Sequence, residues 1–170
     1  RYRLVGSEMC IRDRGKGGHA ASPHLAIDPV VISAQVISAV QTIISRSTDP
    51  VDKALISITK INAGTAYNVI DDQVKMGGTI RTFRRETRAY IEKRLNELCK
   101  GIADAHGAEI KIEFDLVNKY PPTINSKEET KFAANVAKDL VGDDKVITDI
   151  DPSMGAVSYT HLRAHETVTY

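Results

Sequence analysis

The order of helix and strand signals in this 170-residue sequence predicts an α+β fold: a four-stranded antiparallel sheet with two helices on one face. Some stretches alternate apolar and polar residues with the period of two that a half-buried strand requires. Others space apolar residues three and four apart, as an amphipathic helix does. Because the two kinds of stretch are interleaved along the chain, we expect the helices to pack on the sheet rather than to form a separate domain.

The first helix is expected to begin at Asp28-Pro29 and to fade between Arg46 and Asp49. Aspartate is a strong N-cap, and proline fits the first helical position because its missing N–H is not needed there. The apolar residues that recur at helical spacing are Val30, Ala34 and Ile37, with Val36, Val40, Ile43 and Ile44 widening the face.

Two strands should follow, over Ala54–Asn62 and Gln73–Phe83, separated by a polar loop. The first is rich in β-branched residues. In the second, the side chains on one face are Val74, Met76 and Ile80, and those on the other are Lys75, Thr79 and Arg81. Gly77-Gly78 in its middle indicates a bulge or a close backbone approach.

A second helix carries Ile91, Leu95, Leu98 and Ile102 on one stripe and should end at Gly107, a typical left-handed cap. The stretch 109–116 then alternates strictly between charged and apolar residues, which predicts an antiparallel strand with one wet face. A strand before Gly15 would complete β-α-β-β-α-β, the ferredoxin-like sandwich. A further helix over Lys127–Val141 and a short strand over Val146–Ile150 are expected to belong to a neighbouring domain.

The coding sequences of the two ends of the chain can be complementary to each other. Leu4–Asp13 can be encoded by a string whose reverse complement encodes Val157–Glu166, and the string resembles a transposase sequencing adapter. We therefore exclude residues 1–14 and 157–170 from functional reasoning. The expectation is that the authentic chain starts and stops in mid-protein. The adapter would then stand in for the first strand, whose absence would leave an open sheet edge.

Composition excludes several classes of function. The 23 Lys and Arg residues nearly balance the 22 Asp and Glu residues, so the protein lacks the net positive charge that would attract nucleic acid or an anionic membrane. No apolar run is expected to span a bilayer. Cys10 and Cys99 show neither metal nor redox spacing. A cytoplasmic protein is the default expectation.

The stretch Gly15–His24 is the strongest candidate for a functional site. Three glycines precede His19, and glycine allows another group to come close to the main chain. A histidine on such a loop can reach a ligand. By itself, however, the pattern also suits an ordinary turn histidine.

Three segments carry a resemblance to a known family: Gly15–His24, Ala66–Ile70 and Gly78–Phe83. Together they resemble the aminoacylase/carboxypeptidase family of di-zinc amidohydrolases, in the branch of hippurate hydrolases, indole-acetyl-amino-acid hydrolases and N-acetyl-diaminopimelate deacetylases. The resemblance implies a catalytic domain with two divalent metal ions, zinc or manganese, and a smaller inserted domain that serves as lid and dimerisation surface. Residues 15–118 match the inserted domain, and residues 119–156 match the start of the returning α/β catalytic domain.

The same resemblance implies roles for a few residues. His19 matches a catalytic lid histidine that reaches the partner subunit's active site and stabilises the tetrahedral intermediate. Asn68 matches a substrate-binding asparagine, and Arg81 matches the arginine that holds the substrate carboxylate. Gly17 and Gly18 would give the substrate room. The implied substrate is an N-acyl amino acid, and the implied partner is a second copy of the chain.

The family's metal ligands and catalytic glutamate are missing from the sequence. The motif that begins at Met154-Gly155-Ala156 normally continues with an acidic pair, and adapter sequence follows instead. The fragment alone is therefore expected to bind no metal and to be inactive. Asp71 stands where the family often has proline, which predicts a softer loop.

Other readings remain open from the residues alone. Arg81 could form a surface salt bridge, Asn68 could be an ordinary loop residue, and His24 and His106 read as structural. The acid pairs at 71–72 and 143–144 read as solvated turns. The alternative function is a ferredoxin-like small-molecule-binding or dimerisation module without catalysis. An RNA reader would need exposed aromatics on the middle strands, where only Phe83 occurs.

Overall fold

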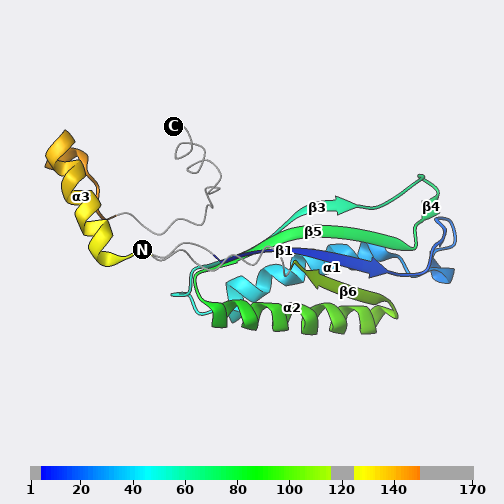
Figure 1. Ribbon diagram of the computed structural model, residues 1–170. Coiled ribbons are helices and arrows are strands. Elements are labelled where there is room, and N and C mark those ends of the chain that lie inside the picture. Colours follow the sequence, from blue (N-terminus) through cyan, green and yellow to red (C-terminus); the bar gives the residue numbers. More distant parts are fainter. Residues whose placement is uncertain (1–4, 116–124, 150–170) are drawn as a thin grey trace. The chain divides into compact units, whose positions relative to one another are not determined.

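The computed structural model describes residues 5–115 and 125–149 (Figure 1). The chain divides into two compact units, one formed by Val5–Tyr120 and the other by Pro121–Tyr170 with Arg1–Leu4. The first unit contains a four-stranded antiparallel sheet, two long helices and a small two-stranded sheet.

The main sheet has the strand order β3-β5-β1-β6, in which β1 is Val5–Arg14, β3 is Ala54–Asn62, β5 is Gln73–Thr82 and β6 is Glu109–Phe114. All neighbouring pairs are antiparallel. With α1 between β1 and β3, and α2 between β5 and β6, this is the β-α-β-β-α-β order of a ferredoxin-like sandwich. The predicted fold class is confirmed.

Residues 5–14 stand in for the first strand, as the adapter interpretation allows, and they occupy the interior of the sheet. Met9 and Ile11 are buried there, and β1 is paired along its length with β5. The predicted open edge of a sheet without its first strand would therefore lie in the middle of the sheet, on both β5 and β6. Because β1 lies between β5 and β6, its loss would split the sheet in two.

Both helices bury one stripe against the same core. Helix α1 (Pro29–Thr42) begins as predicted, with the Asp28 side chain accepting a hydrogen bond of 2.8 Å from the Val30 amide. It ends in a π-helical turn, Ile43–Ser47. Helix α2 (Arg85–His106) ends at Gly107, whose φ of 69° is the left-handed conformation that glycine favours. The core is formed by Met9, Ile11, Ile32, Val36, Val40, Ile43, Ile56, Val74, Met76, Ile80, Ile91, Leu95 and Cys99.

The glycine pair in β5 has the close approach that the sequence predicts. The register between β3 and β5 shifts between Ile58 and Lys60, opposite Gly77 and Gly78. A Cβ at Gly78 would lie 2.2 Å from the Ser57 carbonyl oxygen, which no real side chain tolerates. The bulge therefore depends on glycine at position 78.

The helix over residues 29–47 bears on the expectation that no apolar run is long enough to span a bilayer. Within the described part of the chain, this one helix is long and apolar enough to span a bilayer by length and composition, with a mean hydropathy of 1.3. Its residues Ile32, Val36, Val40 and Ile43 are buried in the core instead. We therefore interpret it as a core helix.

In the second unit, helix α3 (Lys127–Val141) has the predicted bounds. Phe132, Val136 and Leu140 lie on its apolar face and are exposed. No strand forms over residues 146–149, where a short strand was predicted. Instead, a 3-10 turn covers Asp143–Lys145. Residue 150 and the motif at 154–156 lie outside the described residues.

Candidate functional site

The predicted His19 and Asn68 lie on two segments that a small two-stranded sheet brings together at the end of the sandwich where Figure 1 labels β4. Strand β2 (Gly18–His19) pairs antiparallel with β4 (Val69–Ile70), so that His19 lies opposite Val69. The Ala20 amide donates a hydrogen bond of 3.0 Å to the Asn68 carbonyl oxygen. His19 and Asn68, which are exposed and 49 positions apart in the sequence, thus lie on neighbouring segments, and we call this region, residues 15–27 with 63–72, the tip.

The sequence did not predict β2 or β4, because two-residue strands leave no periodic pattern. The β-branched residues Val69 and Ile70 within a polar loop are the one signal that could have indicated β4. Their pairing with Gly18 and His19 depends on a contact between distant segments, which the local sequence does not specify.

Backbone hydrogen bonds hold the glycine loop against its neighbours. Lys16 and Ile27 exchange two bonds of 2.9 Å, and the Gly15 amide donates to the Asp72 carbonyl at 3.0 Å. A Cβ at Gly15 would lie 2.1 Å from the Ile27 carbonyl oxygen. The loop can lie this close to the chain at residue 27 because it carries no side chain at position 15.

Gly17 and Gly18 also have a packing reason within the chain. A Cβ at Gly17 would lie 3.0 Å from the Ile70 carbonyl oxygen, and one at Gly18 would lie 3.1 Å from the Ala26 Cβ. Both glycines therefore let β2 and the following turn pack tightly. Their predicted contact with a substrate remains a prediction.

The His19 ring is held by the main chain that follows it. The Ala21 amide donates a hydrogen bond of 3.1 Å to His19 Nδ1, and the Ser22 amide donates one of 2.8 Å to the His19 carbonyl. His19 thus occupies the first position of a tight turn, and its side chain caps that turn. The imidazole remains exposed at the surface of the tip.

Arg81 lies far from the tip, so the structure does not bring it together with His19 and Asn68. It is paired with Leu55 and Gly6 near the C-terminal end of β5, whereas Gln73 at the other end is paired with Arg14, next to the tip. Eight residues of strand correspond to about 27 Å. His19 and Arg81 of one chain therefore cannot contact the same small molecule.

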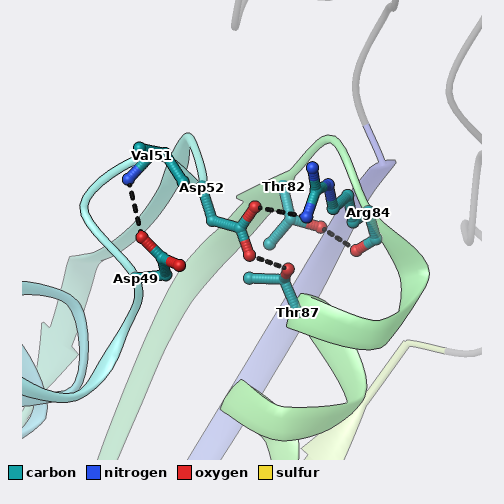
Figure 2. A network of polar contacts seen from close by, with 6 residues as sticks. All are labelled: Asp49, Val51, Asp52, Thr82, Arg84 and Thr87. Carbon is teal, nitrogen blue, oxygen red and sulfur yellow. Dashed lines mark hydrogen bonds and ion pairs between the residues drawn. The ribbon is translucent and has the colours of Figure 1, made fainter.

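The end of the sheet that carries Arg81, which we call the root, is fixed by a polar network around Asp52 (Figure 2). Its carboxylate accepts a hydrogen bond of 2.8 Å from Thr87 Oγ1 and pairs with Arg84 Nη1 at 3.0 Å. Thr82 Oγ1 donates to the Arg84 carbonyl at 3.0 Å. Asp52 thereby places a negative charge at the N-terminus of α2, where Arg84, the N-cap residue, makes no side-chain cap.

Sequence patterns could not reveal this network, because its members are 35 positions apart. Nothing local to Asp52 distinguishes it from other acids in turns. The loop before β3 and the turn after β5 become neighbours only when β3 and β5 pair.

The two histidines that we interpreted as structural, His24 and His106, lie outside the paired strands β2 and β4. His106 lies in the last turn of α2, and its Nε2 is 2.9 Å from Gln35 Oε1 of α1, so it links the two helices. His24 is exposed in the short 3-10 turn Pro23–Leu25. Asp71 accepts a hydrogen bond of 2.7 Å from Thr65 Oγ1, which ties the tip loop at the position where a softer loop was predicted.

The described residues do not fit a metal pair. Over residues 5–115 and 125–149, no three His, Cys, Asp or Glu side chains gather into a group that could hold an ion. Asp13 is the one strongly perturbed acid in this part of the chain: it is buried in β1, and burial raises its pKa to about 6. It lies at the end of β1 that leads into the tip, but its side chain is buried in the core beneath Ser33 of α1 and is not part of the exposed surface of the tip.

These observations define a class of protein. The chain provides a sheet backed by helices, with His19 and Asn68 at the tip and Arg81 at the root. Such an arrangement is an α+β sandwich domain of the ferredoxin-like class.

Comparisons with known proteins identify the family. The model of the peptidase dimerisation domain of M20 proteins matches residues 8–107. The hippurate hydrolase of Campylobacter jejuni is 41% identical over 129 residues, covering 76% of this chain and 33% of that protein. An N-acyl-L-amino acid amidohydrolase of Geobacillus stearothermophilus is 43% identical over 118 residues, covering 69% and 31%.

A solved structure agrees. The Bacillus subtilis YXEP protein, a dinuclear metal binding peptidase from the M20 family, is 28% identical with a TM-score of 0.61, covering 89% of this chain and 36% of its own. The chain belongs to the M20 family of amidohydrolases and peptidases, and it contains the dimerisation domain of that family. It spans about one third of the length of the curated relatives named above.

Proposed function

We propose that the parent protein is a metal-dependent amidohydrolase that cleaves N-acyl amino acids, and that this chain is its lid and dimerisation domain. The observation that carries the proposal is the pairing, at an exposed tip in a member of this family, of the two segments that carry His19 and Asn68. Relatives with the names hippurate hydrolase and N-acyl-L-amino acid amidohydrolase support this substrate class.

The tip would supply donors for the reaction. When water attacks an amide carbonyl, negative charge grows on the oxygen, and one donor aimed at that oxygen is worth about 3–4 kcal/mol of barrier. The exposed imidazole of His19 and the amide of Asn68 are such donors. Because the described residues hold no metal cluster, the two divalent ions of the proposal would be bound by the remainder of the parent, and the fragment alone would be inactive.

Arg81 at the root would bind the substrate carboxylate through its planar guanidinium. Within one chain, Arg81 and His19 are separated by about 27 Å along the strand. A single active site that uses both residues must therefore take them from two different chains. The edge strands β3 and β6 offer a way. If either pairs with its own copy about a two-fold axis perpendicular to the sheet, the strands run antiparallel and the tip of one chain lies beside the root of the other.

The proposal therefore unites dimerisation and catalysis. His19 and Asn68 of one copy would serve the active site that Arg81 of the second copy helps to form. The rival function is a binding or dimerisation module without catalysis, which would use Arg81 for a carboxylate ligand and would not require His19. A cytoplasmic location is part of the proposal, and cell fractionation tests it.

A chimera tests the proposed function. Residues 15–115 of this chain replace the corresponding segment of the Campylobacter jejuni hippurate hydrolase, and turnover of hippurate is measured with and without a chelator. His19→Ala should lower kcat by about 100-fold with a small change in KM, because the donor acts in the transition state. Arg81→Ala should mainly raise KM.

The matched control is His24→Ala, which removes another exposed histidine from the same tip and should leave kcat and KM unchanged. A chimera that turns over hippurate equally well with and without His19 would reject the catalytic role and favour the binding module. Light scattering of the 170-residue protein tests the dimer separately.

A further inference from the structure

The hydrogen bond at His19 Nδ1 determines which form of the ring the tip presents. A backbone N–H can only donate, so the 3.1 Å contact from the Ala21 amide makes Nδ1 the acceptor and leaves it without a proton. A neutral imidazole carries one proton, which must then lie on Nε2. Within the described part of the chain, Nε2 has no hydrogen-bond partner, and the ring is exposed.

The main chain around this contact is held from both sides. The Ala20 amide is bonded to the Asn68 carbonyl, and the Ser22 amide is bonded to the His19 carbonyl, so the residues before and after Ala21 are both fixed. The Ala21 amide therefore stays directed at the ring. Loss of this one donor would free the imidazole to rotate and to exchange its tautomers.

We propose that the Ala21 backbone amide is a positioning group that selects the Nε2–H tautomer of His19, so that the tip presents a proton donor on the segment that pairs with the one carrying Asn68. Such a ring fits a ligand with a negative or partly negative oxygen. It fits neither a metal ion nor a proton to be abstracted, because both need a lone pair on Nε2. The use of the donor in amide hydrolysis rests on the proposed function, whereas the tautomer itself does not.

Nuclear magnetic resonance of the 170-residue protein, labelled with 15N, tests the tautomer directly. We expect a coupling across the hydrogen bond between the Ala21 amide nitrogen and His19 Nδ1, and ring 15N shifts of a single Nε2–H form. His19→Gln assigns the signals. The exposed His24 is the internal control and should show the mixed tautomers of a free ring.

A pair of variants tests the cause. Ala21→Pro removes the amide proton and should bring the His19 ring shifts to those of His24, whereas Ala21→Ser keeps the proton and should retain the coupling. The Ala20 amide, still bonded to Asn68, reports whether the tip remains folded in each variant. If Ala21→Pro disrupts the tip, the coupling in the unaltered protein decides the question alone.

The inference is overturned if the unaltered protein shows no coupling, or if its His19 ring has the same tautomer mixture as His24. In the chimera, Ala21→Pro should lower kcat about tenfold or more while KM changes less than twofold. A confirmed tautomer with an unaffected kcat would refute the proposed catalytic use of His19 and leave the positioning role of Ala21 intact.

Discussion

The buried acid in β1 leads to a quantitative prediction. Asp13 is 0% exposed and lies between Val74 of β5 and Ile110 of β6. One of its oxygens accepts a hydrogen bond of 3.1 Å from Ser33 Oγ, and the other, Oδ1, has no partner among the described residues. Strand alternation places an apolar side chain at such a core position, so an ionised carboxylate here should destabilise the fold.

The size and sign of the effect follow from the pKa. Burial raises the pKa of Asp13 from its ordinary 3.8 to about 6, against the opposing effect of the Ser33 hydrogen bond. Below pH 3.8 the acid is protonated in both the folded and the unfolded chain, and its shifted pKa costs nothing. Between pH 3.8 and about 6 the unfolded state ionises while the folded state keeps its proton, so the folded state loses stability progressively, up to about 3 kcal/mol once the pH is above 6.

Asp13→Asn removes the charge and keeps the shape. Urea unfolding at pH 7 and at pH 4 should show that the variant gains stability over the unaltered protein at pH 7, and that most of this gain disappears at pH 4. Asp72→Asn, which removes an exposed acid from the same unit, should change the difference between the two pH values by less than about 0.5 kcal/mol. A gain from Asp13→Asn that is the same at both pH values would refute the reasoning.

Other predictions follow from single contacts, each measured by urea unfolding. Leu95→Ala should cost about 2–5 kcal/mol because Leu95 is fully buried, whereas Phe132→Ala on the exposed face of α3 should change stability by about 0.5 kcal/mol or less. Gly78→Ala should cost about 1–3 kcal/mol through the clash with the Ser57 carbonyl, and Gly77→Ala, whose Cβ would meet its nearest atom at 3.5 Å, should cost much less. Asp52→Ala should cost about 1–2 kcal/mol, because it removes the acceptor of the Thr87 hydroxyl and the negative charge at the N-terminus of α2. An equal effect of the two glycine variants, or no effect of Asp52→Ala, would contradict these assignments.

Elements with a strong period were predictable. The bounds of β3 (Ala54–Asn62) and α3 (Lys127–Val141) agree with the sequence-based expectation at both ends. Strand β5 ends one residue earlier than predicted. The Asp28 cap, the Gly107 cap and the close approach at Gly78 were also anticipated, because each depends on the local chemistry of one or two residues.

Features built by distant contacts were not predictable in the same way. The strand pair β2–β4, the Asp52 network and the burial of Asp13 each join segments that are separated in the sequence. The local sequence likewise does not give the interior place of β1 between β5 and β6, because strand order depends on which edges meet in space.

By itself, the sequence determined the interleaved helices and strands, the glycine loop around His19 and the family to which its motifs belong. These features are written in residue spacing and local backbone chemistry. Only the tertiary structure decided that the segments carrying His19 and Asn68 are neighbours while Arg81 lies about 27 Å away along β5. The physical reason is that an extended strand carries its two ends far apart, and strand pairing alone determines which other residues meet each end.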